Sequence, residues 1–427
     1  MTWGLLAPAK IESTRRARTL GLGAAVRDFN DLAVPGMGGV WFGKELVLAT
    51  LGVALTEGGR PGKPISNIVM ANAVEALACC LALRHKSAGR DERLRGSTKL
   101  AGKTDFSFST VRKPGFYVTQ PMRMATVQAL PALGLVASEA TRFNAFSCTE
   151  KGHELIQAAV GPKVVNALHQ WISSDGRVDG KAVWEALSPL EPLPSEARDF
   201  IRAQLHQGSA SEAAASKARR RAALAWVESL YQGTRPPQDW EVKPAFLEND
   251  HWLDLKVGAM FFSTREAAIA VLDCVEAYMG NRDTPLLSLA EPIPKHISAQ
   301  ISKLRTNASA YLAFGHPQKE AKAFCEECVN GDDALVLTKL VGRDERVLRL
   351  RNGSVVPGQA FSGQFGKAQE ADLEPVQEPA ETEASASFLW PAGISGRIKN
   401  LFLLNADLHG GISPWLNNST APTGDEA

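Results

Sequence analysis

A glycine-rich stretch near the start of the chain, GGVWFGKE at residues 38–45, nearly matches a phosphate-binding loop. Such a loop, G-x-x-x-x-G-K-[ST], cradles phosphates on backbone amides, and its Ser or Thr hydroxyl reaches a magnesium ion. Here Glu45 replaces the hydroxyl and would repel phosphate, while Trp41 and Phe42 crowd the loop. The sequence therefore predicts a turn whose aromatic side chains pack under the following helix, with no nucleotide site.

Two other stretches carry residue types that could do chemistry. Cys325 and Cys328 form a C-x-x-C with His316 upstream, but zinc usually takes four ligands and no second C-x-x-C exists. DHWLD, at residues 250–254, places a histidine between two carboxylates without a companion nucleophile. We expect reduced helix cysteines and a half-buried helix start. The sequence thus predicts no metal, no cofactor and no catalytic residue, and an unrecognised enzyme is the remaining alternative.

Basic residues are concentrated just before residue 113. The loop RHKSAGRDERLRGSTKLAGK, residues 84–103, has seven Lys or Arg against two acids, although the formal net charge of the whole chain is only +1. Contact with phosphate needs little more than positive charge on a flexible stem. The alternative to phosphate contact is a basic loop that is only solvated. The same two alternatives hold for a second basic run, KARRR at residues 217–221.

The stretch that follows, TVQALPALGLVASEATRFNAFSCTEKGHEL at residues 126–155, changes its periodicity twice. Thr119 can cap a helix from about residue 120 to 133, Gly134 can end it, and Val136 starts a strand. Residues 142–147 alternate as a second strand, and Thr149 caps the helix GHELIQAAV. The pattern predicts a helix, a two-stranded hairpin and a closing helix in that order.

This order of elements resembles the winged helix-turn-helix superfamily over residues of about 114–160. The resemblance implies a compact three-helix module with a β-ribbon wing, in a family that binds DNA or docks on proteins. A helical wheel places Met122, Ala129 and Leu133 on the core face and glutamines and an arginine on the other, where they can read base edges. Pro131 departs from the family pattern because it removes a backbone hydrogen bond. The predicted nucleic-acid contacts are Arg93, Arg95, Lys99, Lys103, Arg112, Lys113, Gln120, Arg123, Gln128 and Arg142.

The chain as a whole reads as a mainly α, multi-domain protein. Its 427 residues are 44% hydrophobic and 22% charged, which suits a globular chain with two or three cores. A hairpin is predicted at Asn352-Gly353, and the acidic stretch 367–387 has the composition of a disordered linker that could compete with phosphate. The predicted segments are 1–112, a helical domain with the basic loop; 113–160, the winged helix; 161–290, a helical domain; 291–362, a small helical domain with a β-hairpin; 363–388, the linker; and 389–427, a docking segment.

The location expected from the sequence is the cytoplasm. The six cysteines show no disulfide framework, the start of the chain does not resemble a signal peptide, and no apolar run is long enough to predict a membrane span. We expect a non-enzymatic protein that contacts the backbone of duplex DNA through the winged helix and basic loop. The alternative is a docking scaffold, a subunit of a bacterial protein complex that handles foreign DNA in antiviral defence or mobile-element function.

Overall fold

The computed structural model describes residues 18–57, 64–85, 91–138, 140, 142–176, 178, 180–233, 239–362 and 390–416. It is 61% helix with little strand, which confirms the mainly α prediction. The chain forms two compact units: unit 1 holds Met1–Arg27 and Val257–Glu378, and unit 2 holds Asp28–Lys256 and Pro379–Ala427. The predicted linker 363–388 lies outside the described residues.

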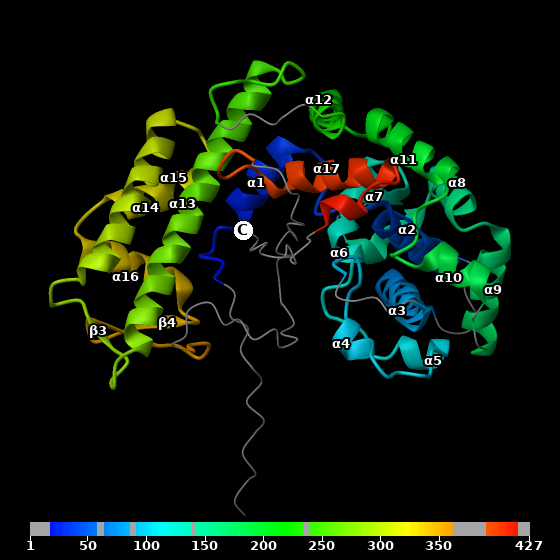
Figure 1. The fold of residues 1–427 in the computed structure, drawn as a ribbon, viewed down its shortest axis with the longest axis horizontal. Helices are drawn as coiled ribbons and strands as arrows, with labels where there is room; N and C mark the ends of the chain where they lie inside the picture. The colour runs from blue at the N-terminus through cyan, green and yellow to red at the C-terminus, as the bar shows by residue number, and fades with distance from the viewer. Residues whose placement is uncertain are drawn as a thin grey trace, which may run out of the picture. The chain divides into compact units, whose positions relative to one another are not determined.

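Two apolar helices form the centre of unit 2 (Figure 1): α2 (Gly43–Glu57) and α3 (Asn67–His85). They approach closely because Gly52 has no side chain, and a Cβ at that position would lie 2.5 Å from the Cα of Ala71. By length and composition α3 could cross a membrane, but 67% of its apolar window is buried inside the protein. Such burial is typical of a core helix, as the lack of a polar face predicts.

The remaining helices of unit 2 pack on this pair or on one another. α8 (Glu150–Ala159) begins at Thr149, whose side chain accepts a hydrogen bond from Gly152 N, as the sequence predicts for a helix cap. The other elements are α1 (Gly23–Ala33, shared with unit 1), α4 (Ser97–Leu100), α5 (Phe108–Val111), α6 (Arg123–Thr126), α7 (Ala129–Ala132), α9 (Pro162–Ser174), α10 (Lys181–Leu187), α11 (Ser195–Gln207), α12 (Ala214–Tyr231), α17 (Gly396–Leu408) and the 3-10 helices η1 (Phe143–Ala145) and η2 (Ser413–Trp415).

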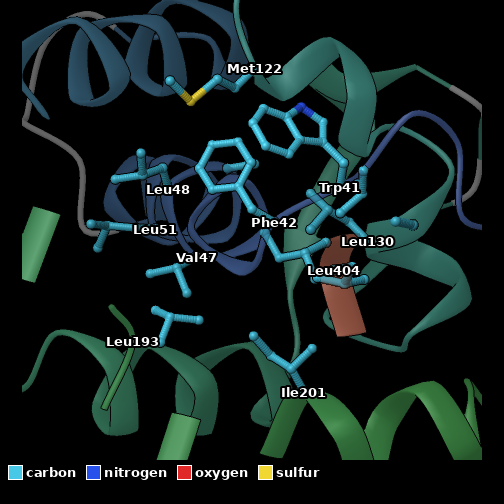
Figure 2. Close-up of a cluster of buried hydrophobic side chains, with 14 of the residues drawn as sticks. Trp41, Phe42, Val47, Leu48, Leu51, Met122, Leu130, Leu193, Ile201 and Leu404 are labelled. Atoms are coloured by element: carbon cyan, nitrogen blue, oxygen red, sulfur yellow. The ribbon is translucent and has the colours of Figure 1, made fainter. Parts of the chain in front are cut away.

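The phosphate-loop-like stretch is a packed turn. Trp41 and Phe42 are each 1% exposed and lie among apolar side chains of α2 and its neighbours (Figure 2). Lys44 and Glu45 are also buried: Lys44 Nζ donates to the carbonyls of Glu185 and Ala186, and Glu45 Oε2 accepts from Trp41 N at 3.0 Å. Both polar groups are therefore used internally, and the turn serves the core as expected.

α17 is a core helix of unit 2. It packs against α12, α11 and α2, and all of its residues except Lys399 and Asp407 are buried. Arg397 bonds Asp31 and the carbonyl of Val34, and Asn405 Nδ2 donates to Glu228 at 2.8 Å. The sequence predicts that the apolar stretch near residue 400 docks on a surface, and in the structure that surface belongs to unit 2 of the same chain. The helices that form it are far away in the sequence.

Unit 1 is a helical group with a small sheet: α13 (Asn249–Gly280, shared with unit 2), α14 (Lys295–Phe314), α15 (Lys319–Val329) and α16 (Asp333–Asp344). Its strands β3 (Leu287–Ser288), β4 (Leu348–Arg351) and β5 (Ser354–Pro357) are antiparallel in the order β3-β5-β4. The turn between β4 and β5 has Asn352 and Gly353 at φ 49° and 72°. Positive φ at both positions is what a tight hairpin turn requires.

The remaining motifs have structural roles. Cys325 and Cys328 lie on α15, both are fully buried, and burial raises the pKa of each thiol, to about 12 for Cys325. His251 Nε2 lies 2.8 Å from the carbonyl oxygen of Ala33, within unit 2. Over the described residues, no group of three or more His, Cys, Asp or Glu side chains is placed to hold a metal ion.

Candidate nucleic-acid interface

A two-stranded hairpin and a closing helix lie where the sequence resembles a winged helix. β1 (Val136–Ser138) pairs antiparallel with β2 (Phe146–Cys148), and α8 follows. One face of the hairpin is buried through Val136 and Phe146, while Ala137 and Ser147 are exposed. The hairpin is therefore a surface element held down along one face.

The prediction of one continuous helix over residues 120–133 is wrong. The structure has two single turns there, α6 and α7, separated at Val127 and Gln128. Pro131 has no N–H to donate to Val127, which removes one bond from the helical hydrogen-bond ladder. Residues 120–133 consequently do not form the continuous helix that contacts DNA bases in a winged helix-turn-helix.

The residues predicted to read bases are bonded or buried inside the protein. Arg123 Nε donates to Asn72 Oδ1 at 2.5 Å, its guanidinium lies 5.4 Å from the ring centre of Phe143, and burial lowers its pKa. Gln128 Oε1 accepts from Arg397 Nη2 at 2.8 Å. Gln120 Nε2 is buried and has no hydrogen-bond partner within the described protein. These side chains do not form an exposed reading face, because a helical wheel assumes a regular helix that the chain does not build.

The first part of the basic loop is partly neutralised. Arg93 forms two hydrogen bonds to Asp91, at 3.0 and 2.8 Å, and its side chain is only 13% exposed. Arg95 is half-buried near the carboxyl of Glu45. Burial raises the pKa of that carboxyl, and the positive charge of Arg95 opposes part of the increase. Lys99 lies half-buried on α4. We therefore remove Arg93 and Arg95 from the expected phosphate contacts.

Cations at the end of the basic loop and in the segment after it keep their charge at the surface. Lys103 Nζ lies 4.7 Å from the ring centre of Phe116, and the Arg112 guanidinium lies 5.6 Å from that of Phe108. Arg112 and Lys113 are exposed, and Lys113 is close enough to Asp105 to help lower the pKa of that carboxyl. We call Lys103, Arg112 and Lys113, with the two rings beneath them, the 103–116 basic surface.

The hairpin and the 103–116 basic surface lie at opposite ends of α3. Asn67 Nδ2, at the start of α3, donates to the carbonyls of Phe143 and Phe146 in the hairpin. Cys80 lies toward the other end of α3, and burial raises the pKa of its thiol to about 12. Lys103 is close enough to Cys80 for its positive charge to oppose that increase. At about 1.5 Å per helical residue, the two ends are about 20 Å apart. Arg142, which is exposed beside η1, is thus a separate contact from the 103–116 basic surface.

A buried polar group that the sequence does not reveal as a site fixes this region. Glu75 Oε1 on α3 accepts from Tyr117 OH at 2.8 Å and from Met122 N at 2.6 Å, and Oε2 accepts from Arg123 N at 3.2 Å. Burial raises the pKa of Glu75. The carboxyl joins α3 to the segment that follows the 103–116 basic surface. Its one signal in the sequence is that it is the single acidic residue of an apolar helix.

The second basic run, residues 217–221, is mostly structural. Arg220 is fully buried and bonds Glu212 and the carbonyl of Leu205. Arg219 forms an ion pair with Asp254 at 2.6 Å. Arg221 remains exposed at this position, so the run does not present a continuous cationic face.

Comparison with known proteins returns no relative: no protein-family model, no curated protein and no solved structure matches this chain.

Proposed function

We propose that this chain is a non-enzymatic nucleic-acid-binding protein that contacts the phosphate backbone of duplex DNA through the 103–116 basic surface. Arg142 beside the hairpin supplies a second, separate phosphate contact. Base recognition by Arg123 and Gln128 is not part of the proposal, because both side chains are engaged inside unit 2. Binding is therefore expected to be independent of base sequence.

The observation that carries the proposal is the way in which two cations are held. Lys103 and Arg112 lie over the rings of Phe116 and Phe108. A ring attracts a cation through its quadrupole and leaves the positive charge intact, whereas a carboxylate would neutralise it. The rings themselves are almost fully buried, which fixes the positions of the cations above them. A phosphate then meets charges that lose little conformational entropy on binding.

Salt dependence of duplex binding tests the proposal. Titrating the full chain with a 20-base-pair random duplex between 50 and 200 mM salt should give affinity that falls with salt, with a logarithmic slope of about −3 if three phosphates are contacted. Replacing Lys103, Arg112 and Lys113 together by Gln should weaken binding at 50 mM salt by at least tenfold. A duplex of unrelated sequence should bind equally well.

A matched control separates this surface from net charge. Lys163 on α9, Lys295 on α14 and Lys319 on α15 are exposed, and their joint replacement by Gln removes the same charge. The proposal requires the control variant to bind duplex as the unsubstituted chain does. Equal weakening in both variants, or no duplex binding at 50 mM salt, would refute it.

A further inference from the structure

Three large apolar side chains are exposed in one short part of unit 2. Val242 is 67% exposed, Phe246 47% and Leu253 44%. Of the seven large hydrophobic residues exposed in the described parts of the chain, these three fall within 12 consecutive positions. A single exposed apolar residue needs no explanation, whereas a group of them marks an interaction surface.

The backbone brings the three side chains to one region. The segment before α13 folds back along that helix, since the Trp240 ring packs on the Trp252 ring with centres 4.9 Å apart, and Lys256 Nζ bonds Glu241 Oε1 at 3.1 Å. Residues three apart on a helix share a side, so Leu253 lies on the side of α13 that carries Lys256. Val242 directly follows Glu241 and therefore belongs to the segment that lies along this side of α13.

Internal bonds keep the intervening turn compact. Leu247 N donates to the carbonyl of Pro244 at 3.1 Å, and Lys243 Nζ donates to the carbonyl of Leu247. Leu247 itself is buried, so Phe246 beside it is held at the surface. Trp240 Nε1 also donates to the carbonyl of Ala392 at 3.1 Å. The apolar group is thus mounted on fixed backbone.

Acidic side chains surround the apolar group. Asp239, Glu241, Glu248 and Asp250 are all exposed. The two lysines of the same region offset this negative charge only in part: Lys243 donates to a carbonyl and Lys256 pairs with Glu241. We call the three apolar and four acidic residues the 239–253 surface, and its net charge is negative.

We infer that the 239–253 surface docks a basic amphipathic helix of a partner protein. The apolar face of such a helix would cover Val242, Phe246 and Leu253, and its Lys and Arg side chains would meet the surrounding carboxylates. Negative charge makes the surface unfit for nucleic acid or an anionic membrane. It also disfavours a second copy of this chain, because a symmetric contact would set acids against acids. The docking site is independent of the 103–116 basic surface.

A designed peptide pair tests this inference on the full chain. The first peptide is an 18-residue Leu/Lys helix with one apolar face, and the second has Glu at every Lys position. Fluorescence anisotropy should show that the Lys peptide binds and the Glu peptide does not. Leu253→Ser and the pair Glu241→Gln, Glu248→Gln should each weaken binding of the Lys peptide at least fivefold.

Leu335→Ser provides the matched control, because Leu335 on α16 is 43% exposed and lies in unit 1. It should leave the affinity for the Lys peptide unchanged, and circular dichroism should show that all variants are folded. Equal affinities of the Leu253→Ser and Leu335→Ser variants would overturn the inference. So would binding of the Glu peptide, or a dimer in the unsubstituted chain that Phe246→Ser abolishes.

Discussion

Lys44 and Glu45, adjacent and buried at the start of α2, should make a joint contribution to the stability of unit 2 that is lowest near pH 8. Burial raises the pKa of Glu45 to about 8 from an ordinary value of 4.5, against the opposing hydrogen bond from Trp41 N. Burial lowers the pKa of Lys44 to about 8 from 10.5, although Asp407 opposes that change. The substitution Glu45→Gln isolates the contribution of Glu45, because glutamine has nearly the same shape as glutamate but does not titrate.

The direction follows from proton binding in the two states. Between pH 4.5 and about 8 the folded chain holds a proton on Glu45 that the unfolded chain releases, so stability falls as pH rises. At about 1.4 kcal/mol for each pH unit, that loss is at most about 5 kcal/mol. Between about 8 and 10.5 the unfolded chain keeps the proton on Lys44 that the folded chain has lost, so the contribution of Lys44 to stability rises by at most about 3 kcal/mol.

Urea unfolding followed by tryptophan fluorescence measures this, because eight of the nine tryptophans, all but Trp3, belong to unit 2. Between pH 6 and 9 the Glu45→Gln variant should lose less free energy of unfolding than the unsubstituted chain. The slope should not vanish, because burial also raises the pKa values of Glu75 and Asp407. Glu154→Gln, at an exposed position of α8, is the control. If the curves of the two variants run parallel from pH 6 to 9, the reasoning about buried Glu45 is refuted.

Two further predictions test how unit 2 is built. Gly52→Ala should destabilise unit 2 by about 1–3 kcal/mol in the same urea assay, because the new Cβ meets the backbone of Ala71, whereas Gly342→Ala on α16, where nothing lies within 4 Å, should not destabilise. A loss below about 0.5 kcal/mol would show that α2 and α3 can separate freely. Ending the chain after residue 389 removes α17 and should abolish cooperative unfolding of unit 2 in the fluorescence assay, whereas ending it after Leu416 should preserve the transition.

Features that depend on neighbouring residues were the ones that the sequence could predict. Thr149 accepts from the amide three positions on, and the Asn352-Gly353 turn needs only positive φ at two successive residues. The apolar composition of α2 and α3 likewise indicates buried helices, because a helix with no polar face has to be covered. Each of these signals acts within a few positions and needs no knowledge of the rest of the fold.

Features that depend on distant partners could not be predicted. Gln128 is a good base-reading residue by type, but its amide oxygen accepts from Arg397, 269 positions away. Arg93 and Arg112 are equivalent in a charge count, yet one is neutralised by Asp91 and the other lies over the Phe108 ring. A count of lysines and arginines measures how much charge a segment carries, while the fold decides how much of it reaches the solvent.

The opposite charges of the two proposed surfaces make their occupants separable in one experiment. The 103–116 basic surface and the 239–253 surface both belong to unit 2, and a polyanion and a basic helix would each be repelled by the other's site. A saturating Leu/Lys peptide should therefore leave duplex bound to the chain, at a concentration where the free peptide does not itself titrate the DNA. Loss of duplex that persists in the Leu253→Ser variant would mean that peptide and DNA interact in solution. Loss that disappears in that variant would mean that the two sites are coupled.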